Sequence, residues 1–223
     1  MSRPRVILHG SVSLDGRIDG FMPDIGLFYE LAQTWQEGAS LAGTDTLLAA
    51  AGEGEEEAAE PVAPPGSDDR RPLLVVPDSR GRFQRWREML AASFWRAGLA
   101  LCTEVTPQEH LDYLDRAGIE RLTVGEDRVD LAAALEHLAT QRGVQTVRVD
   151  SGGTLNGALL RAGLVDEVSV LINPCLVGGL SPRSMFRAPD LTPDEAAIPL
   201  RLIHLEQIRD DIVWLRCEVK RGD

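Results

Sequence analysis

The sequence has few cysteines and no long apolar run, and it lacks the features of a secreted protein. Its three cysteines, Cys102, Cys175 and Cys217, lie far apart without metal-ligand spacing, each in or beside an apolar run, so we expect buried structural thiols. No apolar run approaches the ~20 residues of a membrane-spanning helix, and the N-terminal residues lack the layout of a signal peptide. We therefore expect a cytoplasmic protein that does not associate with membranes.

Positive charge is also scarce, and the histidines show no pattern. The net charge of −12 makes a nucleic-acid or anionic-membrane partner unexpected, although a local basic pocket for a phosphorylated small molecule is compatible with it. The four histidines, His9, His110, His137 and His204, are scattered without partner spacing, so we expect surface or strand histidines without a catalytic role. No metal site is predicted.

The length and the apolar content fit one large domain over residues 1–223. The chain is 43% hydrophobic, which is enough for a sizeable core. Residues 52–71 differ in composition, because Glu, Asp, Ala and Pro dominate and Val62 is the single large apolar side chain available for burial. Since strand-like patterns resume on both sides, we predict a flexible, solvated insertion there.

Apolar, β-branched runs alternate with helical patterns along the chain. Strands are predicted at 5–13, 39–42, 72–76, 99–102, 122–124, 144–149 and 167–172. Helices are predicted at 25–37, 107–117 and 131–141, whereas 84–96 reads as irregular, its aromatics serving the core or a dimer contact. Residues 200–206 and 212–219 read as a hairpin. This order predicts a three-layer α/β/α sandwich with a mixed, mostly parallel sheet and an antiparallel C-terminal hairpin.

The stretch Val149–Gly157 carries the clearest functional signal. A strand leads into two glycines, Gly152 and Gly153, and then into a helical pattern. Such a turn lets the backbone approach a phosphate, while Ser151 and Thr154 are candidates to cap the helix, whose first N–H groups then face the negative charge. A tight turn without a ligand is the alternative interpretation.

Three other polar turns also follow predicted strands. They begin at Gly43, Asp78 and Gly125, and together with Gly152 they are expected to collect along one edge of the sheet. In open α/β sheets the ligand crevice lies at the carboxyl ends of the parallel strands. The sequence therefore predicts a ligand site at this edge.

Several of these motifs, in this order, resemble the reductase domain of riboflavin biosynthesis, which has the dihydrofolate-reductase-like fold. The resemblance rests most strongly on Val149–Thr154, Gly163–Glu167, Asn173-Pro174 and Gly178-Gly179, and it extends to Ser13–Gly16, Gly43–Thr46 and Val76–Ser79. It implies NADPH as hydride donor, a homodimer, and a ribosylamino-pyrimidine 5′-phosphate whose opened ribose is reduced to a ribityl chain. The chain contains no His-x-Glu followed by Pro-Cys-x-x-Cys, so a stand-alone reductase is expected rather than one fused to a deaminase.

The chain departs from the family pattern around the expected substrate. The Asp-Pro and Arg elements that usually follow Thr46 are missing, and Ala50 replaces an acidic residue. The first helix carries Phe28 and Trp35 in place of arginines, although Arg183 and Arg187 could compensate from a late loop. Two alternatives therefore stay open: a reductase of the same fold acting on a pterin or another heterocycle, and a non-catalytic nucleotide-binding relative.

Together the turns and the resemblance give a set of candidate site residues. The predicted cofactor-binding residues are Ser11, Gly43, Thr44, Thr46, Ser79, Arg80, Gly125, Glu126, Gly152, Gly153, Thr154 and Leu155. The predicted substrate residues are Ser13, Phe28, Trp35 and Asp150. Asp150 and Asp15 are the catalytic candidates, because hydride transfer requires a proton delivered or oriented nearby. A turn-forming role is the alternative for Asp15.

Overall fold

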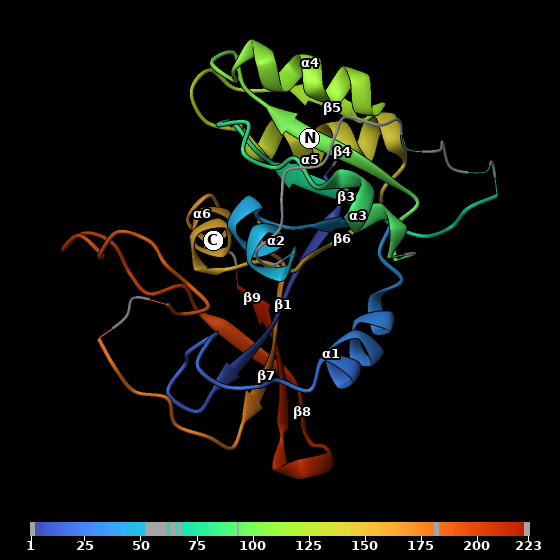
Figure 1. Ribbon diagram of the computed structural model, residues 1–223. Coiled ribbons are helices and arrows are strands. Elements are labelled where there is room, and N and C mark those ends of the chain that lie inside the picture. Colours follow the sequence, from blue (N-terminus) through green and yellow to red (C-terminus); the bar gives the residue numbers. More distant parts are fainter. Residues whose placement is uncertain are drawn as a thin grey trace. The chain divides into compact units, whose positions relative to one another are not determined.

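The computed structural model describes residues 3–51, 62, 66, 68–92, 94–180 and 183–220, so most of the predicted insertion at 52–71 lies outside the described residues. The chain forms two compact units (Figure 1). The first unit contains Glu37–Val147 with the N-terminal residues before Arg5, and the second contains Arg5–Gln36 and the residues from Arg148 onward. The prediction of one domain over residues 1–223 stays a prediction.

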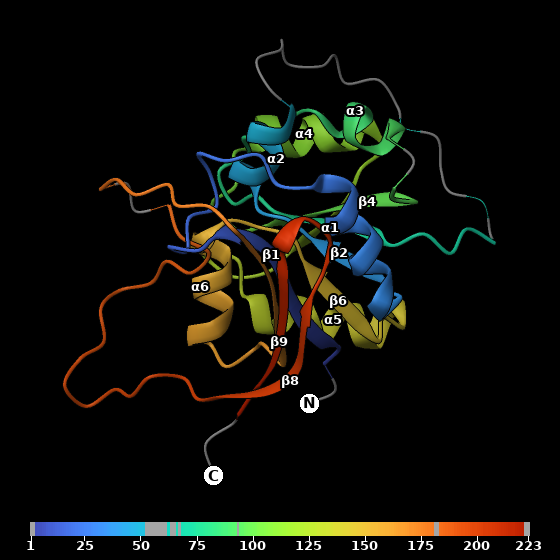
Figure 2. The ribbon, with the colours of Figure 1, turned by 90° about the horizontal axis from the view of Figure 1, so that it is seen from below.

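Parallel strands between helices make up the first unit. Its strands are β2 (Ala39–Leu41), β3 (Leu73–Pro77), β4 (Ala97–Cys102) and β5 (Glu120–Thr123), which pair in parallel in the order β5-β4-β3-β2. Its helices are α2 (Thr44–Ala51), α3 (Trp86–Ala91), α4 (Gln108–Ala117) and α5 (Leu131–Arg142). Helices α3 and α4 lie on one side of these strands and α5 on the other, as Figures 1 and 2 show.

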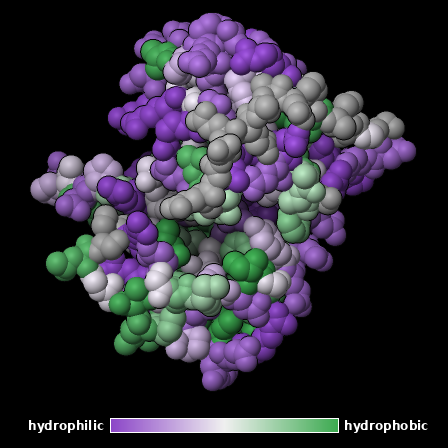
Figure 3. All heavy atoms as spheres, viewed as in Figure 1, coloured by the Kyte–Doolittle hydropathy of each residue, from purple (hydrophilic) through white to green (hydrophobic). Residues whose placement is uncertain are grey.

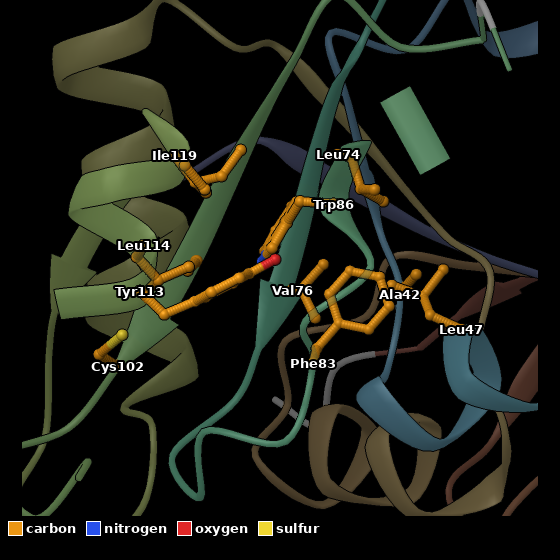
Figure 4. Packing of buried hydrophobic residues seen from close by; sticks show 12 residues of the cluster. Ala42, Leu47, Leu74, Val76, Phe83, Trp86, Cys102, Tyr113, Leu114 and Ile119 are labelled. Carbon is orange, nitrogen blue, oxygen red and sulfur yellow. The ribbon is translucent and has the colours of Figure 1, made fainter. Parts of the chain in front are cut away.

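The core of the first unit follows from strands that are apolar on both faces. Leu74 and Val76 of β3 pack with α2, α3 and α4 in one cluster, which includes Trp86 and Leu114 (Figure 4). Their neighbour Val75 points to the opposite face, because successive strand residues alternate. Burial on both faces is the pattern of a parallel strand covered by helices on both sides.

Helix α3 corrects the prediction of an irregular segment at 84–96. Its six residues are too few to show a helical repeat in the sequence, but Trp86 is 1% exposed and anchors the helix in the core. Trp95 packs against the same cluster, whereas Phe94 is 57% exposed, so the expected core role of these aromatics is confirmed in part. Val62 also packs against this cluster, and its backbone N–H donates to the carbonyl of Ala117.

The second unit combines parallel and antiparallel strands. Strand β1 (Arg5–Ser13) pairs in parallel with β7 (Glu167–Asn173), which pairs antiparallel with β9 (Val213–Val219), and β9 in turn with β8 (Leu200–Gln207). Strand β6 (Thr146–Val149) leads from the first unit into the second and is followed by α6 (Gly153–Arg161). The mixed, mostly parallel sheet with an antiparallel C-terminal hairpin is therefore confirmed.

Helix α1 (Ile25–Ala32) covers one face of the strands in the second unit. It begins at Asp24, whose carboxylate accepts a hydrogen bond of 2.8 Å from the N–H of Leu27. The helix packs against Ile7 of β1 and Trp214 of β9. It ends earlier than the predicted residue 37, because a short 3-10 turn (Gln33–Trp35) replaces its last part.

The burial of the cysteines and the hydropathy of the helices test two expectations from the sequence, that of structural thiols and that of no membrane-spanning helix. Cys102 and Cys217 are buried and Cys175 is half-buried, and all three are free thiols. Burial raises the pKa of Cys102 to about 11, with the nearby Asp78 carboxylate contributing in the same direction, as expected of a structural thiol. Among the described helices, none is long and apolar enough to cross a membrane.

Candidate functional site

Seven of the predicted cofactor residues lie in the first unit, directly after parallel strands. The turns after β2, β3 and β5 carry Gly43, Thr44, Thr46, Ser79, Arg80, Gly125 and Glu126. Since β2, β3 and β5 belong to one parallel set, these turns share one edge of the unit. The predicted gathering of these turns is thus confirmed within the first unit.

Hydrogen bonds connect these turns to each other. The hydroxyl of Thr44 donates to the carbonyl of Pro77 at 2.9 Å, which joins the turn after β2 to the end of β3. The hydroxyl of Thr106 donates to the carbonyl of Ser79 at 3.1 Å. The Thr106 bond holds the Ser79–Arg80 turn itself, while the Arg80 side chain is exposed and available to a ligand.

The turn after β5 requires glycine at position 125. Gly125 has a φ of 93°, and a Cβ there would lie 2.9 Å from the backbone nitrogen of Asp130 and against the carbonyl of Arg128. The carbonyl of Gly125 accepts a hydrogen bond of 3.2 Å from the N–H of Glu104. Gly125 thus has a conformational role whether or not a ligand binds beside it, and Glu126 is exposed next to it.

A buried histidine and aspartate support the turn after β3. The Nε2 atom of His110 lies 3.5 Å from Oδ2 of Asp78, and both side chains are 2% exposed. The same carboxylate accepts a hydrogen bond of 2.7 Å from the N–H of Phe83. Burial lowers the pKa of His110, and the Asp78 carboxylate opposes this shift. The expected surface or strand position is wrong for His110, which lies buried on α4.

In the second unit, Asp15 ties two loops together. Its carboxylate accepts hydrogen bonds from the hydroxyl of Ser13 at 2.6 Å and from the N–H groups of Val177 and Gly178 at 3.1 and 2.7 Å. These bonds, with that from Ser13 the strongest, lower the pKa of Asp15 well below its usual range. A general acid must hold a proton, so this geometry favours loop anchoring for Asp15 over proton donation.

The end of β1 is held by β7. The amide of Asn173 donates to the hydroxyl of Ser11 at 2.8 Å and to the carbonyl of Val12 at 2.9 Å. The Ser11 hydroxyl is therefore already an acceptor within the protein, and its own proton is left for another partner. Asn173 belongs to the Asn-Pro motif, but no sequence pattern predicts this contact.

Asp150 lies at the end of β6 beside two residues that the sequence analysis did not select. The Tyr29 hydroxyl and the Arg148 guanidinium each donate to Oδ2 of Asp150 at 3.3 Å. The guanidinium carbon lies 5.7 Å from the centre of the Tyr29 ring. Burial and the Asp150 carboxylate raise the pKa of Tyr29, so its hydroxyl stays protonated and serves as a donor. The available signal was a charged residue, Arg148, between Val147 and Val149 in a predicted strand.

The two aromatic residues predicted for the substrate have packing roles in the second unit. Phe28 is 6% exposed and stacks on the His9 ring with centroids 4.3 Å apart. Trp35 is 8% exposed, and its indole N–H donates to Oε1 of Glu167 at 3.3 Å. The aromatic residue of α1 that contacts Asp150 is Tyr29. Substrate contacts of Phe28 and Trp35 stay predictions.

Helix α6 begins without a side-chain cap. Gly152, which has no side chain, occupies the N-cap position, so neither Ser151 nor Thr154 is the N-cap residue, contrary to expectation. The first N–H groups of any helix lack intrahelical acceptors, so those of Gly153, Thr154 and Leu155 are suitable donors to an anion. Thr154 is exposed.

Gly153 permits a close approach that the sequence did not reveal. A Cβ there would meet the carbonyl of Ser184 and lie 3.1 Å from the backbone nitrogen of Arg187. The N–H of Arg187 also donates to the carbonyl of Gly153 at 2.9 Å. Gly153 is therefore needed for packing against the segment 184–187, in addition to any role toward a phosphate.

The chain is similar in sequence to a known family and to named relatives within it. The family model of the RibD C-terminal domain matches residues 4–214. The 2,5-diamino-6-ribosylamino-4(3H)-pyrimidinone 5′-phosphate reductase of Methanothermobacter thermautotrophicus is 30% identical over 220 residues, which are 95% of this chain and 96% of the relative. The protein of the same name from Archaeoglobus fulgidus is 34% identical over 108 residues, 48% of each chain.

Solved structures confirm the fold. A pyrimidine reductase-like protein of Corynebacterium diphtheriae superposes with a TM-score of 0.76 at 17% identity, over 98% of this chain and 93% of that one. RibD of Acinetobacter baumannii gives a TM-score of 0.69 at 23% identity, over 98% of this chain and 58% of the longer RibD chain. With the match of the family model over most of its length, the chain belongs to the RibD C-terminal domain family.

Proposed function

We propose that this protein is a cytoplasmic, NADPH-dependent reductase of riboflavin biosynthesis that acts on 2,5-diamino-6-ribosylamino-4(3H)-pyrimidinone 5′-phosphate. The observation that carries the proposal is the alignment over nearly the whole chain with a reductase of that name, at 30% identity. The three free thiols are consistent with a reducing compartment.

The described residues suit a dinucleotide phosphate. The uncapped N-terminus of α6 offers the N–H groups of Gly153, Thr154 and Leu155 to a pyrophosphate. The exposed Arg80, next to the fixed Ser79, is suited to a bidentate contact with a 2′-phosphate, which would favour NADPH over NADH. When bound, the nicotinamide ring would supply the hydride.

In the proposed reaction the carbon of the opened ribose that is bonded to the amine gains a hydride, and the adjacent nitrogen gains a proton. Asp150 is the residue to which we assign the orientation of the substrate during this step, because it is a half-buried carboxylate at the end of β6, beside the glycine turn. Asp15 instead keeps the loops at 13–17 and 177–178 in place. Most of the rate would come from holding the donor and acceptor together.

We also propose that the protein is a homodimer. Leucines of β8 are exposed on a single face of the β8–β9 hairpin: Leu200 by 46%, Leu202 by 54% and Leu205 by 62%. Hydrophobic side chains gather on the part of the surface that belongs to the second unit (Figure 3). Several exposed leucines on one face of a strand support an interface with another protein surface.

Titration with NADPH and with NADH, followed by an oxidation assay with the ribosylamino-pyrimidinone phosphate, tests the proposal. We expect tighter binding of NADPH and turnover with this acceptor. Asp150→Ala should abolish turnover and leave the NADPH dissociation constant within about twofold, since Asp150 is assigned to the substrate. Binding without turnover would favour the pterin-type or non-catalytic alternatives. If neither cofactor binds, the assignment of the α6 turn is wrong.

A further inference from the structure

The contacts around Asp150 distinguish its two oxygen atoms. Oδ2 accepts both the Tyr29 hydroxyl and the Arg148 guanidinium, each at 3.3 Å. No residue in the described part of the chain donates a hydrogen bond to Oδ1. The Asp150 side chain is 27% exposed, so the carboxylate can be reached by a ligand.

We propose that Tyr29 and Arg148 are positioning residues that hold Oδ2 of Asp150 and thereby direct Oδ1 at the substrate. The inference rests on the proposed reductase function and adds to it the residues that orient the carboxylate. A carboxylate with one oxygen held by two donors loses its rotational freedom about the side-chain bonds, so its other oxygen points in one direction.

The burial of Arg148 supports this interpretation. Arg148 is 3% exposed and stands between two buried valines of β6. A buried guanidinium is costly unless it is paired, and removal of one partner of a buried pair is strongly destabilising. A strand that needed only packing would carry an apolar residue at this position. The hydrogen bond to Asp150 is one contact that accounts for an arginine at this position.

Tyr29 places the second donor without adding charge. Its ring packs edge-on against Phe28, with centroids 5.1 Å apart, and the Arg148 guanidinium lies over its face. These contacts fix the ring, and the ring fixes the direction of the hydroxyl. Because the hydroxyl stays protonated, Tyr29 donates to Asp150 and does not compete with it as a second anion.

The chemistry of Oδ1 limits what it can bind. An ionised carboxylate oxygen only accepts hydrogen bonds, so its partner must be an N–H or O–H group. In the proposed substrate this means an amino or ring N–H group of the pyrimidine or a hydroxyl of the sugar chain. Asp150 would reject an acceptor-only analogue at that position, because the carboxylate would be left without a partner.

A double-mutant cycle tests the inference. We expect Tyr29→Phe to lower kcat/KM about tenfold, the usual size for a hydrogen bond to a charged group, and to change the NADPH dissociation constant less than about twofold. In an Asp150→Asn background the same change should have less than about a twofold effect, because its consequence passes through the carboxylate. Where Asp150→Asn is too slow to assay, the cycle is measured on the substrate dissociation constant.

Control variants separate positioning from folding. Tyr113→Phe removes the other tyrosine hydroxyl of the chain, in the first unit, and should leave kcat/KM unchanged. Arg148→Lys keeps the charge and should restore part of the activity lost in Arg148→Met. Arg121→Lys alters an arginine that also lies 3.3 Å from an aspartate, Asp115, but is more exposed, and it should have no effect.

The possible outcomes are distinct. Equal losses of kcat/KM from Tyr29→Phe in both backgrounds would overturn the proposal that Tyr29 acts through Asp150, and would mean that Tyr29 has only a structural role. A normal kcat/KM in Tyr29→Phe and in Arg148→Lys and Arg148→Met would also overturn it. If the unmodified protein binds NADPH but does not turn over the pyrimidinone phosphate, the proposed function is wrong, and the positioning of Asp150 is tested separately. The double-mutant cycle is then measured on the dissociation constant of the pyrimidinone phosphate. Additive effects of the two substitutions on this constant would reject the proposed positioning of Asp150 by Tyr29.

Discussion

His9 shows how single buried polar residues organise the second unit. A carbonyl can only accept, so Nε2 of His9 donates to the carbonyl of Phe28 at 3.1 Å. Burial lowers the pKa of His9 to about 3, so the imidazole is neutral and Nδ1 accepts from the Ser169 hydroxyl at 3.0 Å, while that hydroxyl accepts from the indole N–H of Trp214 at 2.9 Å. This chain of bonds links β1, β7 and β9 to α1, the helix that carries Tyr29.

The neutral state of His9 predicts a loss of stability in acid. Burial lowers the pKa of His9 from 6.5 to about 3, so the unfolded chain binds a proton at a pH where the folded chain does not. Stability contributed by His9 is thus complete above pH 6.5 and falls as the pH drops toward 3. Between pH 7 and pH 5 the loss from His9 should be about 2 kcal/mol.

Urea unfolding of the protein and of His9→Gln at these two pH values measures this effect. Glutamine offers one donor and one acceptor but does not titrate, so the pH dependence should shrink by about 2 kcal/mol in the variant. Burial of His110 acts with the same sign in both proteins and cancels in the comparison. An unchanged pH dependence would show that His9 is not buried in its neutral form.

At the level of helices and strands, the sequence predicts those elements whose pattern is long enough to be periodic. The buried strands β1, β3 and β4 and the helices α4 and α5 follow from their apolar repeats. Helix α3 does not, because it owes its existence to Trp86 rather than to a repeat. The shared edge of the turns at Gly43, Ser79 and Gly125 was also predictable, since each turn follows a strand of one parallel set in the first unit.

Contacts between distant segments were not predictable in the same way. Asp150 and Arg148 are two residues apart, whereas Tyr29 is 121 residues away from Asp150. Neither the periodicity nor the composition of the sequence indicates that Tyr29, instead of Phe28 or Trp35, contacts the carboxylate of Asp150. The role of Gly153 toward the segment 184–187 was hidden for the same reason.

This packing of α6 predicts the effect of filling the space at Gly153. In Gly153→Ala the new methyl group would overlap the carbonyl of Ser184, a backbone atom that yields only if the segment moves. We expect a stability loss of about 1–3 kcal/mol and faster hydrogen exchange at the Arg187 N–H, which bonds to the Gly153 carbonyl.

Ala158→Ser, on the exposed side of the same helix, is the matched control and should change neither quantity. Hydrogen exchange at Arg187 that stays slow in Gly153→Ala would show that α6 accepts a side chain at this position. The glycine would then be explained by ligand binding alone.

At the level of the whole molecule, the composition indicates which partners are unexpected more clearly than which partners are present. The acidic charge argues against nucleic acid, but it says nothing about association with a second copy. That information lies in the hairpin β8–β9, the antiparallel ribbon at the C-terminal end of the sheet in Figure 2. Exposed leucines on β8 lie opposite β9 residues of the same face, in the pairs Leu200–Val219, Leu202–Cys217 and Leu205–Leu215.

On the other face of this hairpin, His204 packs against Trp214 with ring centroids 4.5 Å apart, and Arg201 pairs with Glu218. The prediction of a dimer therefore rests on the face of the hairpin that carries Leu200, Leu202 and Leu205.

Light scattering during size-exclusion chromatography should give twice the mass of the chain, and the double variant Leu202→Glu, Leu205→Glu should give the mass of one chain. Each copy would place two like charges in a symmetric interface, which costs several kcal/mol. Phe94→Glu, a residue of similar exposure in the first unit, should stay dimeric. A monomeric unmodified protein, or a double variant that still dimerises, would exclude this face as the interface.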